Sequence, residues 1–270
     1  MSGVTHASGI HEGRRLDEAT RREVLARFER EGYALIAGVL SAEEVGLIRA
    51  LTDRWIDQPP RGGVVVDNYL GAEVLRYTQS LDRAFCDMLV RQPLLELAEA
   101  GVCGECGFVG QNVIRGKPGG AITRWHVDDT VEWPLPDDIP RHDPRMRMPV
   151  TWFSFQIALS DITAIEHGPT QVVPGSHYSG RDVPGDEAQL VFEGRGPEPI
   201  FCRAGDVYLF NHQLWHRGMP NTGDRTRYLM QNQYARRWCV RRFGLPENGC
   251  TLPEAQLAGA SDRLRRMLGR

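Results

Sequence analysis

The segment Val150–Leu159, with the sequence VTWFSFQIAL, is a short, largely apolar run bounded by breaks. Runs of this kind, apolar or alternating, recur between glycine and proline breaks throughout the chain after Gly101. They cover residues 108–114, 170–173, 189–192, 206–210 and 227–234. Many short strands separated by turn signals are typical of an all-β barrel or sandwich.

The first hundred residues have a different character. Leu16–Arg30 has apolar residues on one helical face and Gly32 just past its end, which predicts a helix. Residues 33–40 predict a strand. Ser41-Ala42-Glu43-Glu44 has the spacing of a capping box and predicts a helix through Trp55, and residues 81–100 predict another helical stretch.

These patterns together predict a mainly β fold with flanking helices, built on a double-stranded β-helix core of the jelly-roll or cupin type. We expect one domain over residues 1–270. Within it, residues 1–14 are expected to be a flexible tail, residues 15–100 to be helix-rich and residues 101–240 to form the β-core.

Composition narrows the classes of function. Hydrophobic residues make up 41% and charged residues 25% of the 270, as in an ordinary globular protein. A net charge of -3 gives no electrostatic case for binding nucleic acid or an anionic membrane surface. No apolar run reaches membrane-spanning length and the N-terminus lacks a secretory core, so we expect a cytoplasmic monomer or homodimer that acts on a small molecule.

Trp125-His126-Val127-Asp128 and Leu214-Trp215-His216 carry the strongest chemical signal. Residues two apart on a strand point to the same face, so His126 and Asp128 can bind one metal ion from one side. A second histidine from a neighbouring strand would complete two histidines and one carboxylate, the facial triad of non-haem Fe(II) oxygenases. By spacing alone, either His216 or His212 could supply it.

Further motifs extend this pattern along the chain. Residues 168–177 read GPTQVVPGSH, residues 204–210 read AGDVYLF, and His216 is followed by Asn221 and Arg227. In this order and spacing, together with Glu31-Gly32-Tyr33, the chain resembles the phytanoyl-CoA dioxygenase family of Fe(II)/2-oxoglutarate oxygenases, which includes ectoine hydroxylase.

The resemblance implies roles for particular residues. It implies that His126, Asp128 and His216 bind the iron and that Arg227 binds the distal carboxylate of 2-oxoglutarate, with Arg225 as the competing arginine. A guanidinium is a bidentate partner for a carboxylate, which agrees with this role. The resemblance further implies that three residues reach the cosubstrate or substrate: Gln111, Arg115 and Ser154.

The implied activity is oxidation of an unactivated C–H bond with Fe(II), 2-oxoglutarate and O2, by hydroxylation, cyclisation, epimerisation or desaturation. The alternative is a cupin-type dioxygenase or isomerase that does not use 2-oxoglutarate. Lys117 is the only lysine beside 31 arginines, which suggests a GC-rich bacterial genome and a tailoring step in secondary metabolism such as antibiotic biosynthesis.

The segment 129–149 is too long, and too rich in proline and charged residues, to be a hairpin turn. Because this segment directly follows two predicted iron ligands, we expect it to be a lid over the site. Trp133 and Asp129 are its predicted substrate contacts.

Overall fold

A computed structural model describes residues 6–59, 66–69, 71–102, 104–120, 124–240 and 254–268. Its α-helices are α1 (Glu18–Glu31), α2 (Ala42–Asp57), α3 (Arg83–Asp87), α4 (Leu94–Gly101), α5 (Glu254–Leu257) and α6 (Asp262–Met267). Three 3-10 turns are η1 (Thr78–Ser80), η2 (Ser176–Tyr178) and η3 (Glu187–Gln189). Within these described ranges, no helix is long and apolar enough to cross a membrane.

The strands pair into two antiparallel sheets. They are β1 (Tyr33–Ile36), β2 (Val66–Tyr69), β3 (Ala72–Arg76), β4 (Cys106–Gly116), β5 (Trp152–Ala158), β6 (Thr170–Val172), β7 (Glu198–Ile200), β8 (Val207–Asn211), β9 (His216–Gly218) and β10 (Arg227–Arg236). The major sheet has seven strands in the order β1-β8-β5-β10-β4-β3-β2, and the minor sheet has the order β7-β6-β9. The predicted double-stranded β-helix core is confirmed.

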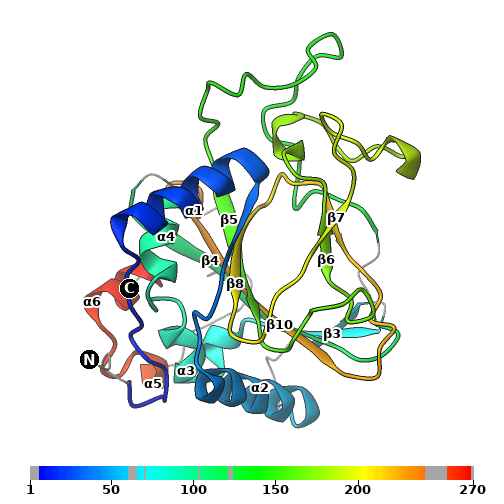
Figure 1. Cartoon of the computed structure of the whole chain (residues 1–270). Coiled ribbons are helices and arrows are strands. Elements are labelled where there is room, and N and C mark those ends of the chain that lie inside the picture. Colours follow the sequence, from blue (N-terminus) through cyan, green and yellow to red (C-terminus); the bar gives the residue numbers. More distant parts are fainter. Residues whose placement is uncertain are drawn as a thin grey trace.

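The helices cover one face of the major sheet, while β6 and β7 lie on its other side (Figure 1). Alternate side chains of β5 and β10, including Phe153, Phe155 and Tyr234, are fully buried in the core that the helices share with the sheet. Because side chains alternate along a strand, the intervening residues of β5 and β10 face the minor sheet. That inner face is where the functional site lies.

Most of the predicted elements are present, with some corrections. The predicted helix over residues 81–100 is two helices, α3 and α4. The run predicted over residues 189–192 is not a strand, because Gln189 ends η3 and Phe192 forms only an isolated bridge with Arg195. Strands β2, β3, β7 and β9 were not predicted. Residues 15–101 contain α1 to α4, and β1, β2 and β3 from the same part of the chain join the major sheet.

The predicted flexible tail over residues 1–14 is wrong for the part that the structure describes, residues 6–14. Ile10 has no exposed surface and belongs to the main core. The backbone N–H of His11 donates to the Glu44 carboxylate at 3.0 Å, and Gly13 forms a parallel bridge with Gln92. Residues 1–5 lie outside the described residues.

The start of α2 has the predicted capping box. The Ser41 hydroxyl accepts from the Glu44 N–H at 3.2 Å, and the Glu44 carboxylate accepts from the Ser41 N–H at 2.9 Å. We expect Ser41→Ala to lower the free energy of unfolding by about 1 kcal/mol because one helix N–H loses its acceptor. A chain of this size would then melt about 2–4 °C lower in calorimetry. Ser41→Asp keeps an acceptor and is the control; equal melting of all three proteins would contradict this account of the cap.

Candidate metal centre

The predicted iron ligands come from two chain segments that are joined by backbone hydrogen bonds. His216 begins β9, and His126 lies outside the regular strands but forms an antiparallel bridge with it. The His126 N–H donates to the His216 carbonyl at 2.9 Å, and the His216 N–H donates to the His126 carbonyl at 3.0 Å. The strand predicted for residues 126–128 is therefore a single bridge, and it still places both imidazoles side by side.

The three predicted ligands converge. The Oδ1 atom of Asp128 lies 3.6 Å from His126 Nε2 and 3.6 Å from His216 Nε2, and the two imidazole centroids are 4.1 Å apart. Within the described ranges this is the one cluster of three or more histidine, cysteine or acidic side chains with atoms close enough to hold a metal ion. Two imidazole nitrogens and a carboxylate on one side of an ion match the facial triad.

Both imidazoles are held in the orientation that a metal needs. Nδ1 of His126 lies 2.8 Å from the Arg124 carbonyl, and Nδ1 of His216 lies 2.8 Å from the Leu214 carbonyl. A carbonyl can only accept, so each Nδ1 carries the proton and each Nε2 presents its lone pair. Burial lowers the pKa of His216 to about 4, so this imidazole is neutral at neutral pH, which is the metal-binding form.

His212, the competing third ligand, has a different environment. Its ring stacks on Trp152 with centroids 4.6 Å apart, and its Nδ1 lies 2.6 Å from the Trp152 carbonyl. Its Nε2 lies 3.5 Å from the Glu132 carboxylate, away from the His126–Asp128–His216 cluster. His212 therefore lies outside the cluster of side chains that contains His216.

The triad opens into a pocket of about 610 Å³ between the two sheets. Its walls come from β3, β4, β5, β8 and β10 on the major-sheet side, and from β6, β9 and the segment before β5 on the other. Besides the triad, the lining side chains are those of Val74, Arg76, Asn112, Ile114, Arg124, Gln156, Thr170, Phe210, Arg217, Arg227, Leu229, Gln231 and Gln233. A volume of this size accommodates a small organic ligand.

Arg227 is the buried arginine of this pocket. Its side chain is 4% exposed, its Nη1 donates to the Gly168 carbonyl, and its buried Nε has no hydrogen-bond partner. Burial lowers the pKa of Arg227, but a guanidinium stays charged in proteins. A buried cation with an unused donor is suited to an anionic ligand. Arg225 is exposed and contacts His167, so the structure favours Arg227 over Arg225.

Gln111 and Arg115 are on β4 but face away from the pocket, so their predicted contact with cosubstrate or substrate is wrong. The Gln111 amide donates to the Phe85 carbonyl at 2.8 Å and to Asn232 at 2.9 Å beneath the helices. Arg115 forms ion pairs with three carboxylates on the helix side of the sheet, at 2.7–2.9 Å: Asp53, Asp57 and Glu73.

The pocket-facing residues of β4 are instead Asn112 and Ile114. Gln111 and Arg115 were predicted from the family resemblance. The sequence offered no check on which side chains face the pocket, because β4 is buried on both faces and lacks polar–apolar alternation. Gln231 and Gln233 were also missed, although they stand four and six residues after Arg227 on the same strand. That even spacing from a predicted site residue was the usable signal.

Ser154 lies on the inner side of β5, but it does not itself line the pocket. Its hydroxyl accepts from the amide of Gln156 at 3.0 Å, and Gln156 is the β5 residue that reaches the lining. Ser154 can therefore act on a bound ligand through the orientation of Gln156.

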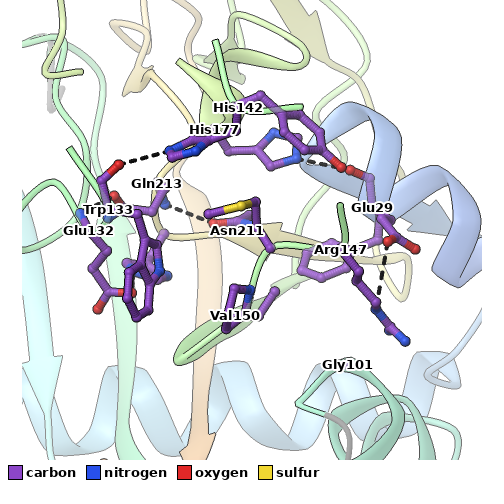
Figure 2. A pocket seen from close by; sticks show the side chains of 15 residues that line it. Glu29, Gly101, Glu132, Trp133, His142, Arg147, Val150, His177, Asn211 and Gln213 are labelled. Carbon is purple, nitrogen blue, oxygen red and sulfur yellow. Dashed lines mark hydrogen bonds and ion pairs between the residues drawn. The ribbon is translucent and has the colours of Figure 1, made fainter. Parts of the chain in front are cut away.

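Trp133 and Asp129 are not among the residues that line the metal pocket, and their contact with substrate stays a prediction. Trp133 instead borders a separate, small cavity with Glu29, His142 and His177 (Figure 2). The segment 129–149 is fixed there, since the Trp133 carbonyl lies 2.8 Å from His142 Nε2 and the His142 N–H donates to the Tyr178 carbonyl at 2.8 Å.

The fold and the donor set define a double-stranded β-helix protein with a site for a facially bound metal. The family model for phytanoyl-CoA dioxygenase (PhyH) matches residues 28–229, and the chain belongs to this family.

One sequence relative agrees with the family, and two solved structures agree with the fold. An ectoine dioxygenase from Stutzerimonas stutzeri is 30% identical over 161 residues, which are 57% of this chain and 50% of that protein. The match thus spans about half of that relative. The crystal structure of HygX from Streptomyces hygroscopicus with nickel, 2-oxoglutarate and hygromycin B has a TM-score of 0.64 at 20% identity and covers 80% of this chain and 88% of its own. The epimerase SnoN in complex with Fe3+, alpha ketoglutarate and nogalamycin RO has a TM-score of 0.63 at 22% identity, covering 81% and 84%.

Proposed function

We propose that this protein is an Fe(II)- and 2-oxoglutarate-dependent oxygenase that oxidises a C–H bond of a small metabolite, in a tailoring step of bacterial secondary metabolism. The observation that carries the proposal is the presence of a facial triad and a buried, incompletely hydrogen-bonded arginine in one pocket. Ectoine dioxygenase, HygX and SnoN support the same class of chemistry.

The residues that line the pocket fit both Fe(II) and 2-oxoglutarate. His126, Asp128 and His216 offer two imidazole nitrogens and a carboxylate oxygen, the donor set that suits Fe(II) with positions left open. The unpartnered Nε of Arg227 fits the distal carboxylate of 2-oxoglutarate. Bound iron would couple the oxidative decarboxylation of 2-oxoglutarate by O2 to oxidation of the substrate.

The protein's own residues would position 2-oxoglutarate and shield the triad from water. Arg227 fixes the far end of the cosubstrate, so that its keto-acid end is directed toward the triad. The Phe210 and His216 rings pack edge to face, with centroids 4.6 Å apart, and Phe210 limits access of water to one side of the triad.

The second candidate is a cupin-type dioxygenase or isomerase that does not use 2-oxoglutarate. The triad alone fits that candidate equally well. Arg227 separates the two, because a metal-only enzyme gains nothing from a buried guanidinium in the metal pocket.

The test measures 2-oxoglutarate binding and consumption by the purified protein. We expect calorimetry under nitrogen to show 2-oxoglutarate binding that depends on Fe(II), and exposure to O2 to yield succinate slowly even without a prime substrate. Asp128→Ala should lose the Fe(II)-dependent part of both signals. Metal binding without any 2-oxoglutarate binding would favour the cupin-type candidate and contradict the proposal.

A further inference from the structure

The major-sheet wall of the pocket is organised in rows. From Arg227, the side chains of β10 that reach the pocket are Leu229, Gln231 and Gln233. Each lies about 6.6 Å beyond the previous one, because a strand rises about 3.3 Å per residue. The proposed cosubstrate carboxylate binds at the Arg227 end, so the glutamine end of β10 remains available for the oxidised substrate.

Gln231 belongs to a row of polar side chains that crosses four strands. In the sheet register it pairs with Asn112 of β4 on one side and with Gln156 of β5 on the other, and Asn112 pairs with Arg76 of β3. All four line the pocket. Directly opposed residues have Cβ atoms about 4.5–5.5 Å apart, so Asn112, Gln231 and Gln156 form a continuous set, here called the amide row.

An apolar row lies beside the amide row, on the side of Arg227. Leu229 pairs with Ile114, and Ile114 pairs with Val74, again with every member lining the pocket. The wall therefore presents a stripe of aliphatic carbon next to a stripe of carboxamides.

The amide row begins near the metal side of the pocket. Phe210 of β8 contacts the His216 ring, and it pairs with Ser154, two residues before Gln156. From Gln156 the row leads across β10 and β4 toward Arg76 on β3, away from β8. A ligand that lies along the row would have one end at the triad and the other near the Arg76 guanidinium.

The chemistry of the row selects its ligand. Gln231 Nε2 donates to Gln156 Oε1 at 3.2 Å, and Gln156 Nε2 donates to Ser154 Oγ at 3.0 Å, so two of the three carboxamides are linked to each other. Each carboxamide has two donors and two acceptor sites, more than these contacts use. An acyl chain placed along this row would displace water from the carboxamides without replacing its hydrogen bonds.

We propose that the substrate is a polyhydroxylated small molecule, such as a sugar or cyclitol or a compound that carries one. Its hydroxyl groups both donate and accept and pair with the amide row, while the C–H face of its ring packs on the apolar row. This inference rests on the proposed oxygenase function, because it assigns the Arg227 end of the pocket to 2-oxoglutarate.

The experiment uses ligand-observed NMR to measure how small probe molecules bind to the protein, which is loaded with Fe(II) and 2-oxoglutarate under nitrogen. The probes are methyl α-glucopyranoside, myo-inositol and sucrose, with decanoate as the apolar probe. We expect at least one polyhydroxylated probe to bind and decanoate to bind more weakly. Asn112→Leu and Gln231→Leu should each weaken that binding about 10-fold, since a carboxamide loses its ligand hydrogen bonds.

Gln189→Leu makes the same chemical change on the exposed turn η3 and should leave probe binding unchanged. The affinity for 2-oxoglutarate, measured on every variant, reports both folding and the first proposal. If 2-oxoglutarate binds and decanoate outcompetes all three polyhydroxylated probes, or if neither leucine variant changes probe binding, the substrate inference is wrong and the oxygenase proposal stands. If 2-oxoglutarate does not bind to the wild-type protein, the oxygenase proposal itself fails.

Discussion

His216→Ala should lower the affinity for Fe(II) by at least about 100-fold. Loss of residues that merely orient metal ligands already costs about 10–100-fold, and His216 supplies a donor itself. Its Nε2 lies 3.6 Å from the Asp128 carboxylate, in the cluster whose atoms would surround the ion. Calorimetric titration of the apo-protein with Fe(II) under nitrogen measures the change in affinity.

His212→Ala is the matched control, because it removes a second buried imidazole only four residues away. It should keep the Fe(II) affinity and lower only the free energy of unfolding, by about 1–3 kcal/mol, as the stacking on Trp152 is lost. The assignment of the third ligand is refuted if His216→Ala binds Fe(II) normally while His212→Ala does not.

Arg227→Ala should weaken 2-oxoglutarate binding strongly. Removing one member of a buried, hydrogen-bonded charge pair costs about 2–5 kcal/mol, because the other charge is left without a partner. This corresponds to a roughly 30-fold to several-thousand-fold loss of affinity. Calorimetry with the Fe(II)-loaded variant measures it, and the Fe(II) affinity should change little because Arg227 is not a metal ligand.

Two variants control this result. Arg225→Ala removes an exposed arginine two residues away and should leave 2-oxoglutarate binding unchanged. Arg227→Lys keeps the charge but not the two-pronged geometry, so it should recover only part of the affinity. Normal binding in Arg227→Ala with a loss in Arg225→Ala would transfer the role to Arg225.

The sequence was sufficient for the parts of the fold that have local signals. The capping box at Ser41 predicted the start of α2, and the apolar runs between breaks predicted β4, β5, β6, β8 and β10. Strands β7 and β9 are three residues long and carry no periodic pattern, and they form through pairing with segments distant in sequence, chiefly β6. The packing of Ile10 likewise depends on residues distant in sequence.

The candidate metal cluster was predictable only in part. His126 and Asp128 are two residues apart, whereas the choice of His216 over His212 came from the resemblance to the family. The inner wall of the pocket was not predictable. Whether Gln111 or Asn112 faces the ligand depends on which side of β4 the helices cover, and β4 is buried on both sides. The amide row depends on the register of four strands, which no short sequence pattern encodes.

The central claim is that one pocket binds both Fe(II) and 2-oxoglutarate through these residues. A crystal structure of the protein soaked with Fe(II) and 2-oxoglutarate under nitrogen tests it most directly. We expect one ion bound by His126 Nε2, Asp128 and His216 Nε2, with the distal carboxylate of 2-oxoglutarate on the Arg227 guanidinium. An ion bound without His216, or 2-oxoglutarate bound elsewhere than on Arg227, would contradict the account.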